Sequence, residues 1–243
     1  MSTAILEARG LTVRFGGLTA LSDVSFRIGQ GQIVGLIGPN GAGKTTLFNA
    51  LVGLVRLSDG DIRLRGHALG QVRPHRIARQ GMTKTFQNTA LFPDMTLREN
   101  VMTAAVVHSS TQQARVLADQ CLERVRLSDA ADESVANLTF PQKALGEVAR
   151  ALATRPKVLL LDEVMAALTP MAMDDVMATI RILRDTEGIT FVVVEHHMRA
   201  IMRLCERVLV LNFGKLLADG SPGHVSSHPE VIKAYLGDGD AAH

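Results

Sequence analysis

The segment from Gly38 to Thr45 constrains the fold of this chain more than any other. It reads Gly-Pro-Asn-Gly-Ala-Gly-Lys-Thr and fits the pattern G-x-x-x-x-G-K-[ST], in which backbone N–H groups cradle phosphate oxygens. Its glycines permit backbone angles that a Cβ would penalise. Residues 32–37 before it read as a buried strand, and residues 45–52 after it as a helix that stops at Gly53. This order predicts a phosphate-binding loop at a helix N-terminus rather than an ordinary glycine-rich turn.

The side chains of this loop predict what it binds. Lys44 would place a positive charge on the β- and γ-phosphates of a nucleotide, and the Thr45 hydroxyl would ligate Mg²⁺. The predicted nucleotide-binding residues of this segment are Gly38, Pro39, Asn40, Gly41, Ala42, Gly43, Lys44, Thr45 and Thr46.

A second acidic element follows further along the chain. The apolar run at residues 158–161 ends in Asp162 and Glu163. Asp162 is predicted to bind Mg²⁺ through its water shell, and Glu163 to act as the general base for an attacking water. The alternative is that both carboxylates mark a helix N-terminus, where the helix dipole favours them.

Composition limits the class of protein. The 243 residues are 47% apolar, and 26 basic against 24 acidic residues give a net charge of +2, which predicts a globular chain and disfavours one that binds nucleic acid by neutralising phosphates. We expect no secretory signal and no membrane span. Cys121 and Cys205 match no metal spacing and are predicted to be reduced. A basic run at residues 63–79 is interpreted as solvated faces, with an acidic partner or lipid head group as the alternative.

Periodicity predicts alternating layers of strand and helix. The runs at 158–161 and 190–194 are wholly apolar, which is typical of parallel strands buried on both faces. Helical stretches precede both runs, as in βαβ units. The remaining predictions are strands at residues 4–15, 24–28 and 61–65, helical segments over 98–126 and the second half of 135–153, and a hairpin over 207–218.

Together these motifs resemble the ATP-binding subunit of ATP-binding cassette (ABC) transporters over nearly the full chain. The resemblance implies an α/β fold: a P-loop NTPase (RecA-like) core with an N-terminal antiparallel β subdomain and an inserted helical lobe. We expect one ABC ATPase domain over residues 4–236, with 4–87 and 154–220 in the core and β subdomain and 88–153 in the lobe. Residues 221–243 would form a C-terminal helix and tail. ATP and Mg²⁺ are the implied ligands.

The resemblance also implies further site residues. Gln87 lies in a segment that looks like the Q-loop, where it would contact Mg²⁺ or its water; a surface glutamine is the alternative. His196 looks like the switch histidine, a catalytic residue that would reach the γ-phosphate and help position the water, whereas His197 is read as structural or exposed. Phe15 is at the family's position for stacking on adenine, with a core phenylalanine as the alternative. Thr139 and Gln142 belong to a segment that looks like the family signature.

Partners and location follow from the same resemblance. Residues 11–21, 85–88, 163–166 and 229–237 are similar to the ATPases of branched-chain amino acid importers. Relatives that serve lipopolysaccharide export share the Tyr-Leu-Gly ending, so lipid export stays an alternative. We expect two membrane permease subunits, a second ATPase subunit bound head to tail, an indirect periplasmic substrate-binding protein, and no nucleic acid. The chain would be peripheral on the cytoplasmic face of the plasma membrane.

The signature departs from the family pattern. It reads Leu138-Thr139-Phe140-Pro141-Gln142 where Leu-Ser-Gly-Gly-Gln is usual. Pro141 has no N–H, so it lacks the donor that the family's glycine gives to the γ-phosphate on the opposite subunit. We expect slow hydrolysis at the site this segment completes, and normal hydrolysis at the site on this chain's own loop if the dimer is heteromeric. A module that binds ATP and barely hydrolyses it is the alternative. Thr169 also replaces the usual Asp or Asn in the segment that looks like the D-loop.

Overall fold

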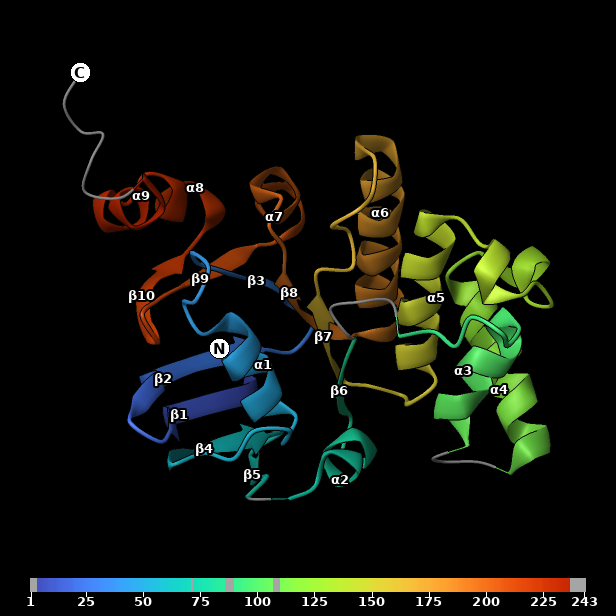
Figure 1. The fold of residues 1–243 in the computed structure, drawn as a ribbon, viewed down its shortest axis with the longest axis horizontal. Coiled ribbons are helices and arrows are strands. Elements are labelled where there is room, and N and C mark those ends of the chain that lie inside the picture. Colours follow the sequence, from blue (N-terminus) through green and yellow to red (C-terminus); the bar gives the residue numbers. More distant parts are fainter. Residues whose placement is uncertain (1–3, 71, 86–89, 107–109, 237–243) are drawn as a thin grey trace.

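The computed structural model describes residues 4–70, 72–85, 90–106 and 110–236. An antiparallel sheet forms the N-terminal part of the fold (Figure 1). Its strands β1 (Ala4–Phe15) and β2 (Leu18–Gly29) alternate between buried and exposed residues, because one face packs on the core and the other meets solvent. Strands β4 (Asp59–Leu64) and β5 (His67–Ala68) complete the order β2-β1-β4-β5. The predicted antiparallel β subdomain is confirmed.

The second sheet has the order β10-β9-β3-β8-β7-β6. Every residue of β3 (Ile33–Ile37), β7 (Val158–Asp162) and β8 (Thr190–Val194) is buried, and these strands run parallel. Strands β9 (Arg207–Asn212) and β10 (Lys215–Gly220) form the predicted hairpin. The sequence did not predict β6 (Met82–Lys84), a three-residue strand that pairs with β7 at the sheet edge.

Two hydrophobic cores flank the parallel sheet, and β3 contributes to both. Ile33 and Ile37 face the core shared with the large helices α5 (Phe140–Leu152), α6 (Pro170–Glu187) and α7 (Met198–Leu204). Val34 and Leu36 face the core shared with α1 (Lys44–Leu51) and the antiparallel sheet. Since side chains alternate along a strand, one fully apolar strand joins the two layers.

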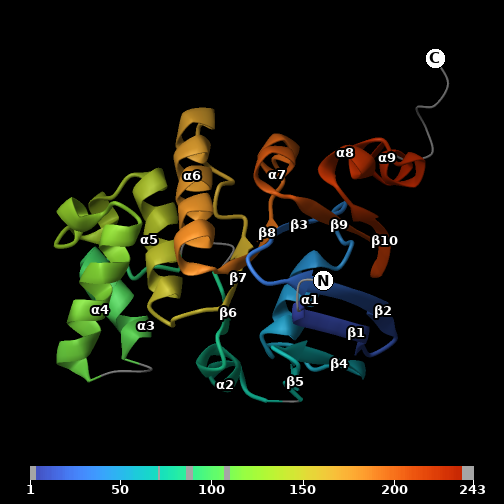
Figure 2. The same ribbon diagram turned by 180° about the vertical axis from the view of Figure 1, so that it is seen from behind.

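Helices α3 (Leu97–Ala105) and α4 (Thr111–Arg124) lie at one end of the molecule and α8 (Pro222–Ser226) and α9 (Pro229–Leu236) at the other, as both ribbon views show (Figures 1 and 2). Helices α3 and α4 pack with α5, in the region predicted to be helical. Two short 3-10 turns, η1 (Ser128–Ala130) and η2 (Val135–Asn137), lie between α4 and α5. Helix α2 (Pro74–Arg79) precedes β6. The predicted C-terminal helix is two helices, α8 and α9, because Pro229 begins a new one. The predicted tail at 237–243 lies outside the described residues.

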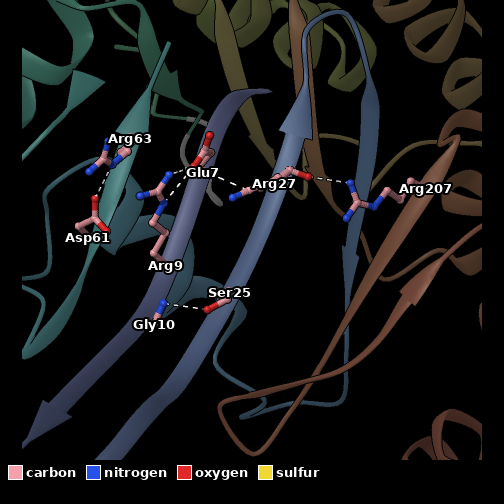
Figure 3. Close-up of polar contacts among 8 residues, drawn as sticks. All are labelled: Glu7, Arg9, Gly10, Ser25, Arg27, Asp61, Arg63 and Arg207. Atoms are coloured by element: carbon pink, nitrogen blue, oxygen red, sulfur yellow. Dashed lines mark hydrogen bonds and ion pairs between the residues drawn. The ribbon is translucent and has the colours of Figure 1, made fainter. Parts of the chain in front are cut away.

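Arginine side chains make polar contacts within and between strands (Figure 3). Arg207 of β9 donates to the Arg27 carbonyl of β2 at 2.7 Å and pairs with Asp219, so it links the two sheets. Arg63, from the basic run, pairs with Asp61 at 2.9 Å. That contact agrees with a solvated strand face.

Within the described residues, none of the helices combines the length and apolar character needed to cross a bilayer.

Candidate functional site

The glycine-rich loop connects buried β3 to α1, so the predicted strand, loop and helix are confirmed. Gly38 has φ 152°, and a Cβ there would lie 2.2 Å from the Leu211 carbonyl oxygen. Gly43, with φ 104°, is the N-cap of α1, and no side chain caps this helix. The first N–H groups of α1 are therefore available to an anionic ligand.

Lys44 is the first residue of α1 and is buried. Its ammonium donates to the Gly38 carbonyl at 2.7 Å and the Pro39 carbonyl at 3.0 Å. Burial lowers the pKa of Lys44, while the Glu163 and Asp162 carboxylates act in the opposite direction. The lysine is thus held over its own loop and faces two acidic groups.

A cavity of about 440 Å³ opens beside this loop. It brings together ten of the predicted site residues: Phe15, Asn40, Gly41, Ala42, Gly43, Lys44, Thr45, Thr46, Glu163 and His196. Phe15 is 50% exposed, so the alternative of a core phenylalanine is wrong. Five lining residues were not predicted as site residues: Leu18, Thr19, Ala20, Phe213 and Gly214. They come from the start of β2 and from the β9–β10 turn, whose proximity to the loop has no sequence signal.

Glu163 and His196 contact each other at the ends of neighbouring strands. The His196 Nε2 atom lies 2.8 Å from the Glu163 Oε1 atom. Glu163 has a left-handed backbone with φ 54°, an uncommon conformation for a residue with a side chain, and its N–H donates to the Val194 carbonyl at 2.9 Å. The next helix begins only at Pro170, so the helix-dipole alternative for Asp162 and Glu163 is wrong.

Asp162 is buried and does not line the cavity. Its carboxylate forms an ion pair with Lys84 at 3.3 Å, and its N–H donates to the Thr85 Oγ1 atom at 3.0 Å. Burial raises the pKa of Asp162, whereas Lys84 and Lys44 lower it. The Lys84 ammonium also donates to the Asn49 Oδ1 atom at 3.0 Å. The sequence did not indicate Lys84, because β6 is too short for a periodicity signal. It did not indicate Asn49, because this residue of α1 meets Lys84 only in the folded chain.

The donor set fits Mg²⁺. No cluster of three His, Cys, Asp or Glu side chains occurs within the described residues, but Mg²⁺ needs only one or two carboxylates when substrate phosphates and waters supply the rest. Asp162 already faces a cationic group, and Thr45 lines the adjoining cavity. These two residues would hold the metal.

Glu195 is a second buried acid that the sequence did not indicate. Its Oε1 atom accepts from the Met165 N–H at 2.8 Å, and its Oε2 atom has no hydrogen-bond partner within the described residues. Burial raises the pKa of Glu195 to about 7. Through this contact the segment that carries His196 is joined to the segment after Glu163.

Thr139 and Gln142 do not line the cavity. Thr139 is the N-cap of α5, where its side chain and that of Gln142 form a capping box, and Pro141 occupies the first turn. Thr169 similarly caps α6, a role that threonine fills nearly as well as aspartate or asparagine. His197 is exposed, as expected. Gln87 lies outside the described residues.

Comparison with known proteins gives a consistent result. A family model described as "ABC transporter" matches residues 21–166, and one described as "Branched-chain amino acid ATP-binding cassette transporter" matches residues 215–241. The chain is 41% identical to the high-affinity branched-chain amino acid transport ATP-binding protein BraF of Pseudomonas aeruginosa, over 98% of this chain and 100% of BraF. LivG of Escherichia coli, which has the same description, is 37% identical over the same shares. The lipopolysaccharide export system ATP-binding protein LptB of Haemophilus influenzae is 35% identical, over 97% and 98%.

Solved structures agree. The ADP conformation of MJ1267, an ATP-binding cassette of an ABC transporter, superposes with a TM-score of 0.89 at 27% identity, over 98% of this chain and 100% of that one. The dimeric structure of MJ0796, a bacterial ABC transporter cassette, has a TM-score of 0.79 at 25% identity, over 89% and 98%.

Proposed function

The chain belongs to the ABC transporter ATP-binding family, and from that premise we propose that it powers the import of branched-chain or related amino acids. As a member of this family it is an ATPase, so the proposal concerns its cargo, its site residues and its partners. Likeness to BraF over 98% of the chain supports the cargo. The observation that carries the chemistry is the Glu163–His196 contact, at 2.8 Å, beside the phosphate-binding loop.

In the proposed reaction Glu163 accepts the proton of the attacking water, and His196 orients this carboxylate through the contact just described. Lys44 and the N–H groups at the start of α1 hold the negative charge of the transferred phosphoryl group. Exposed Phe15 stacks on the adenine ring. Bound Mg²⁺ would neutralise charge on the β- and γ-phosphates, held by Thr45, Asp162 and Gln87.

The proposed assembly is a head-to-tail dimer of ATPase subunits. Thr139 and Gln142 lie away from the cavity of their own chain, which supports a role at the nucleotide of the facing subunit. The dimer would bind two membrane permease subunits on the cytoplasmic face of the membrane. A periplasmic substrate-binding protein would deliver the amino acid to them.

Reconstitution in lipid vesicles tests the function. The chain, its co-expressed permeases and their binding protein are assembled with ATP on the side of the ATPase, and uptake of radiolabelled leucine is measured. We expect uptake that needs ATP and is lost in the Glu163→Gln variant. ATP turnover stimulated by lipopolysaccharide and not by loaded binding protein would instead support export, the alternative that the 35% identity to LptB keeps open.

A further inference from the structure

A lysine from the edge strand of the parallel sheet reaches the predicted metal site. Lys84 ends β6, and its side chain is only 9% exposed. Its ammonium lies 3.3 Å from the Asp162 Oδ2 atom, and the Asp162 side chain is 2% exposed. Two opposite charges are therefore paired where almost no water reaches them.

We propose that Lys84 is a positioning residue: it is the internal counter-ion of Asp162 and is displaced from this carboxylate when a divalent cation binds with the nucleotide. The proposal rests on the proposed function, because it takes Asp162 as a metal-binding residue. It adds a residue that the nucleotide motifs do not include.

Burial requires that the charge of Asp162 be paired. An unpaired carboxylate in so little water is strongly unfavourable, so some cation must accompany the ionised form of Asp162. In the fold described here that cation is Lys84. A divalent cation at the same carboxylate brings twice the charge, and it repels a nearby ammonium. The two cations therefore compete for one anion.

Asn49 gives the displaced ammonium a second partner. Its Oδ1 atom already accepts from Lys84 at 3.0 Å. Asn49 lies on α1 four residues after Thr45, one helical turn along the same face. Lys84 can thus turn from the carboxylate toward the amide while remaining hydrogen-bonded, so its displacement leaves no buried charge unpaired.

Thr85, the residue after β6, forms hydrogen bonds with the backbone of β7. The Thr85 N–H donates to the Leu160 carbonyl at 2.9 Å, and the Asp162 N–H donates to the Thr85 hydroxyl at 3.0 Å. Lys84 therefore contacts the Asp162 carboxylate, and Thr85 accepts from the Asp162 N–H. Both residues come shortly before Gln87, which is predicted to belong to the Q-loop.

The experiment titrates Mg²⁺ into the full chain at saturating ADP and about pH 8, well above the ordinary pKa of an aspartate. The measurement is the unfolding temperature. We compare the wild type with Lys84→Met, Lys84→Arg and Asn49→Ala. Lys157→Met is the matched control. This exposed lysine lies just before the start of β7, whereas Asp162 is the last residue of that strand.

We expect Lys84→Met to lower the Mg²⁺ concentration at half-effect about tenfold, because the competing charge is gone. Its unfolding temperature without Mg²⁺ should fall, and the stabilisation by Mg²⁺ should exceed that of the wild type. Lys84→Arg and the Lys157→Met control should keep the wild-type midpoint within about twofold. Asn49→Ala should raise it, because the displaced ammonium then loses the hydrogen bond to the Asn49 amide.

An unchanged or higher midpoint in Lys84→Met overturns the inference. If this variant does not fold, Asn49→Ala decides alone: an unchanged midpoint overturns the inference. A wild type that ADP and Mg²⁺ do not stabilise would overturn the proposed function itself, so the two failures are distinguishable.

Discussion

The N-termini of α1 and α5 present the same backbone groups and use them in opposite ways. At α1 the N-cap is Gly43, no side chain caps the helix, and the first residue is Lys44. At α5 the N-cap is Thr139, whose side chain forms a capping box with Gln142, and Pro141 removes one N–H from the first turn. One helix start is left for an anionic ligand, whereas the other is satisfied within the chain.

The difference shows what a helix N-terminus needs to become a binding site. Serine at Gly43 could not restore a cap, because its Cβ would lie 2.8 Å from the Ala20 carbonyl oxygen. The α1 start therefore relies on a ligand, while the α5 start is stable without one. The proposed ATP site combines the α1 start of one subunit with the α5 start of the other. We therefore expect the α5 start to contribute less to phosphate binding.

Removal of the predicted base on the α1 side should have the largest effect. Glu163→Gln keeps the shape of the side chain and loses its proton-accepting charge, so ATP turnover should fall by about 10²–10⁴-fold. Nucleotide binding should stay within a few-fold of the wild type, because Glu163 is not expected to hold the phosphates in the ground state. ATP turnover by the assembled transporter measures the first effect, and ADP binding by the isolated chain measures the second. A loss below tenfold would contradict the role of Glu163.

Restoring a donor on the α5 side should give the next largest effect. Pro141→Gly returns the missing N–H to the first turn, and turnover of a transporter in which this signature completes an active site should rise by about 10²-fold. Pro222→Gly is the control, since Pro222 occupies the first turn of α8 after the Ser221 cap. It should leave turnover unchanged. No gain in Pro141→Gly would show that the α5 start is not rate-limiting.

The region around α1 also shows which parts of the site can be predicted from the sequence. The loop before α1 was predictable residue by residue, because glycine spacing and a flanking apolar strand carry local signals. The Asp162–Lys84 pair was not, because β6 spans three residues and only the sheet brings it beside β7. The Glu195 Oε2 atom, which has no hydrogen-bond partner among the described residues, likewise reflects burial, and no local sequence pattern encodes burial. The fold and the phosphate-binding half of the site were therefore predictable, while the buried charges behind it were not.

Two exposed phenylalanines, one near each helix N-terminus, distinguish residues that bind the chain's own nucleotide from residues that face the second subunit. Phe15 is 50% exposed and lines the cavity, and Phe140 is 68% exposed at the first position of α5. Phe15→Ala should weaken ADP binding to the isolated chain about tenfold, because base–aromatic stacking contributes about 1–3 kcal/mol. Phe140→Ala should leave it unchanged. Calorimetric titration of ADP measures both, and equal losses would contradict the division between the two sides.

The smallest effect concerns the cap of α5. Thr139→Ala removes the hydroxyl that accepts from the Gln142 N–H, so the free energy of unfolding should fall by about 1 kcal/mol. Thr169→Ala, at the corresponding position of α6, should cost about the same. Urea denaturation of the isolated chain measures the loss, and ADP binding should not change in either variant. If Thr139→Ala left stability untouched while Thr169→Ala reduced it, the α5 start would not be held by its own side chains, and it would be as open to a ligand as α1.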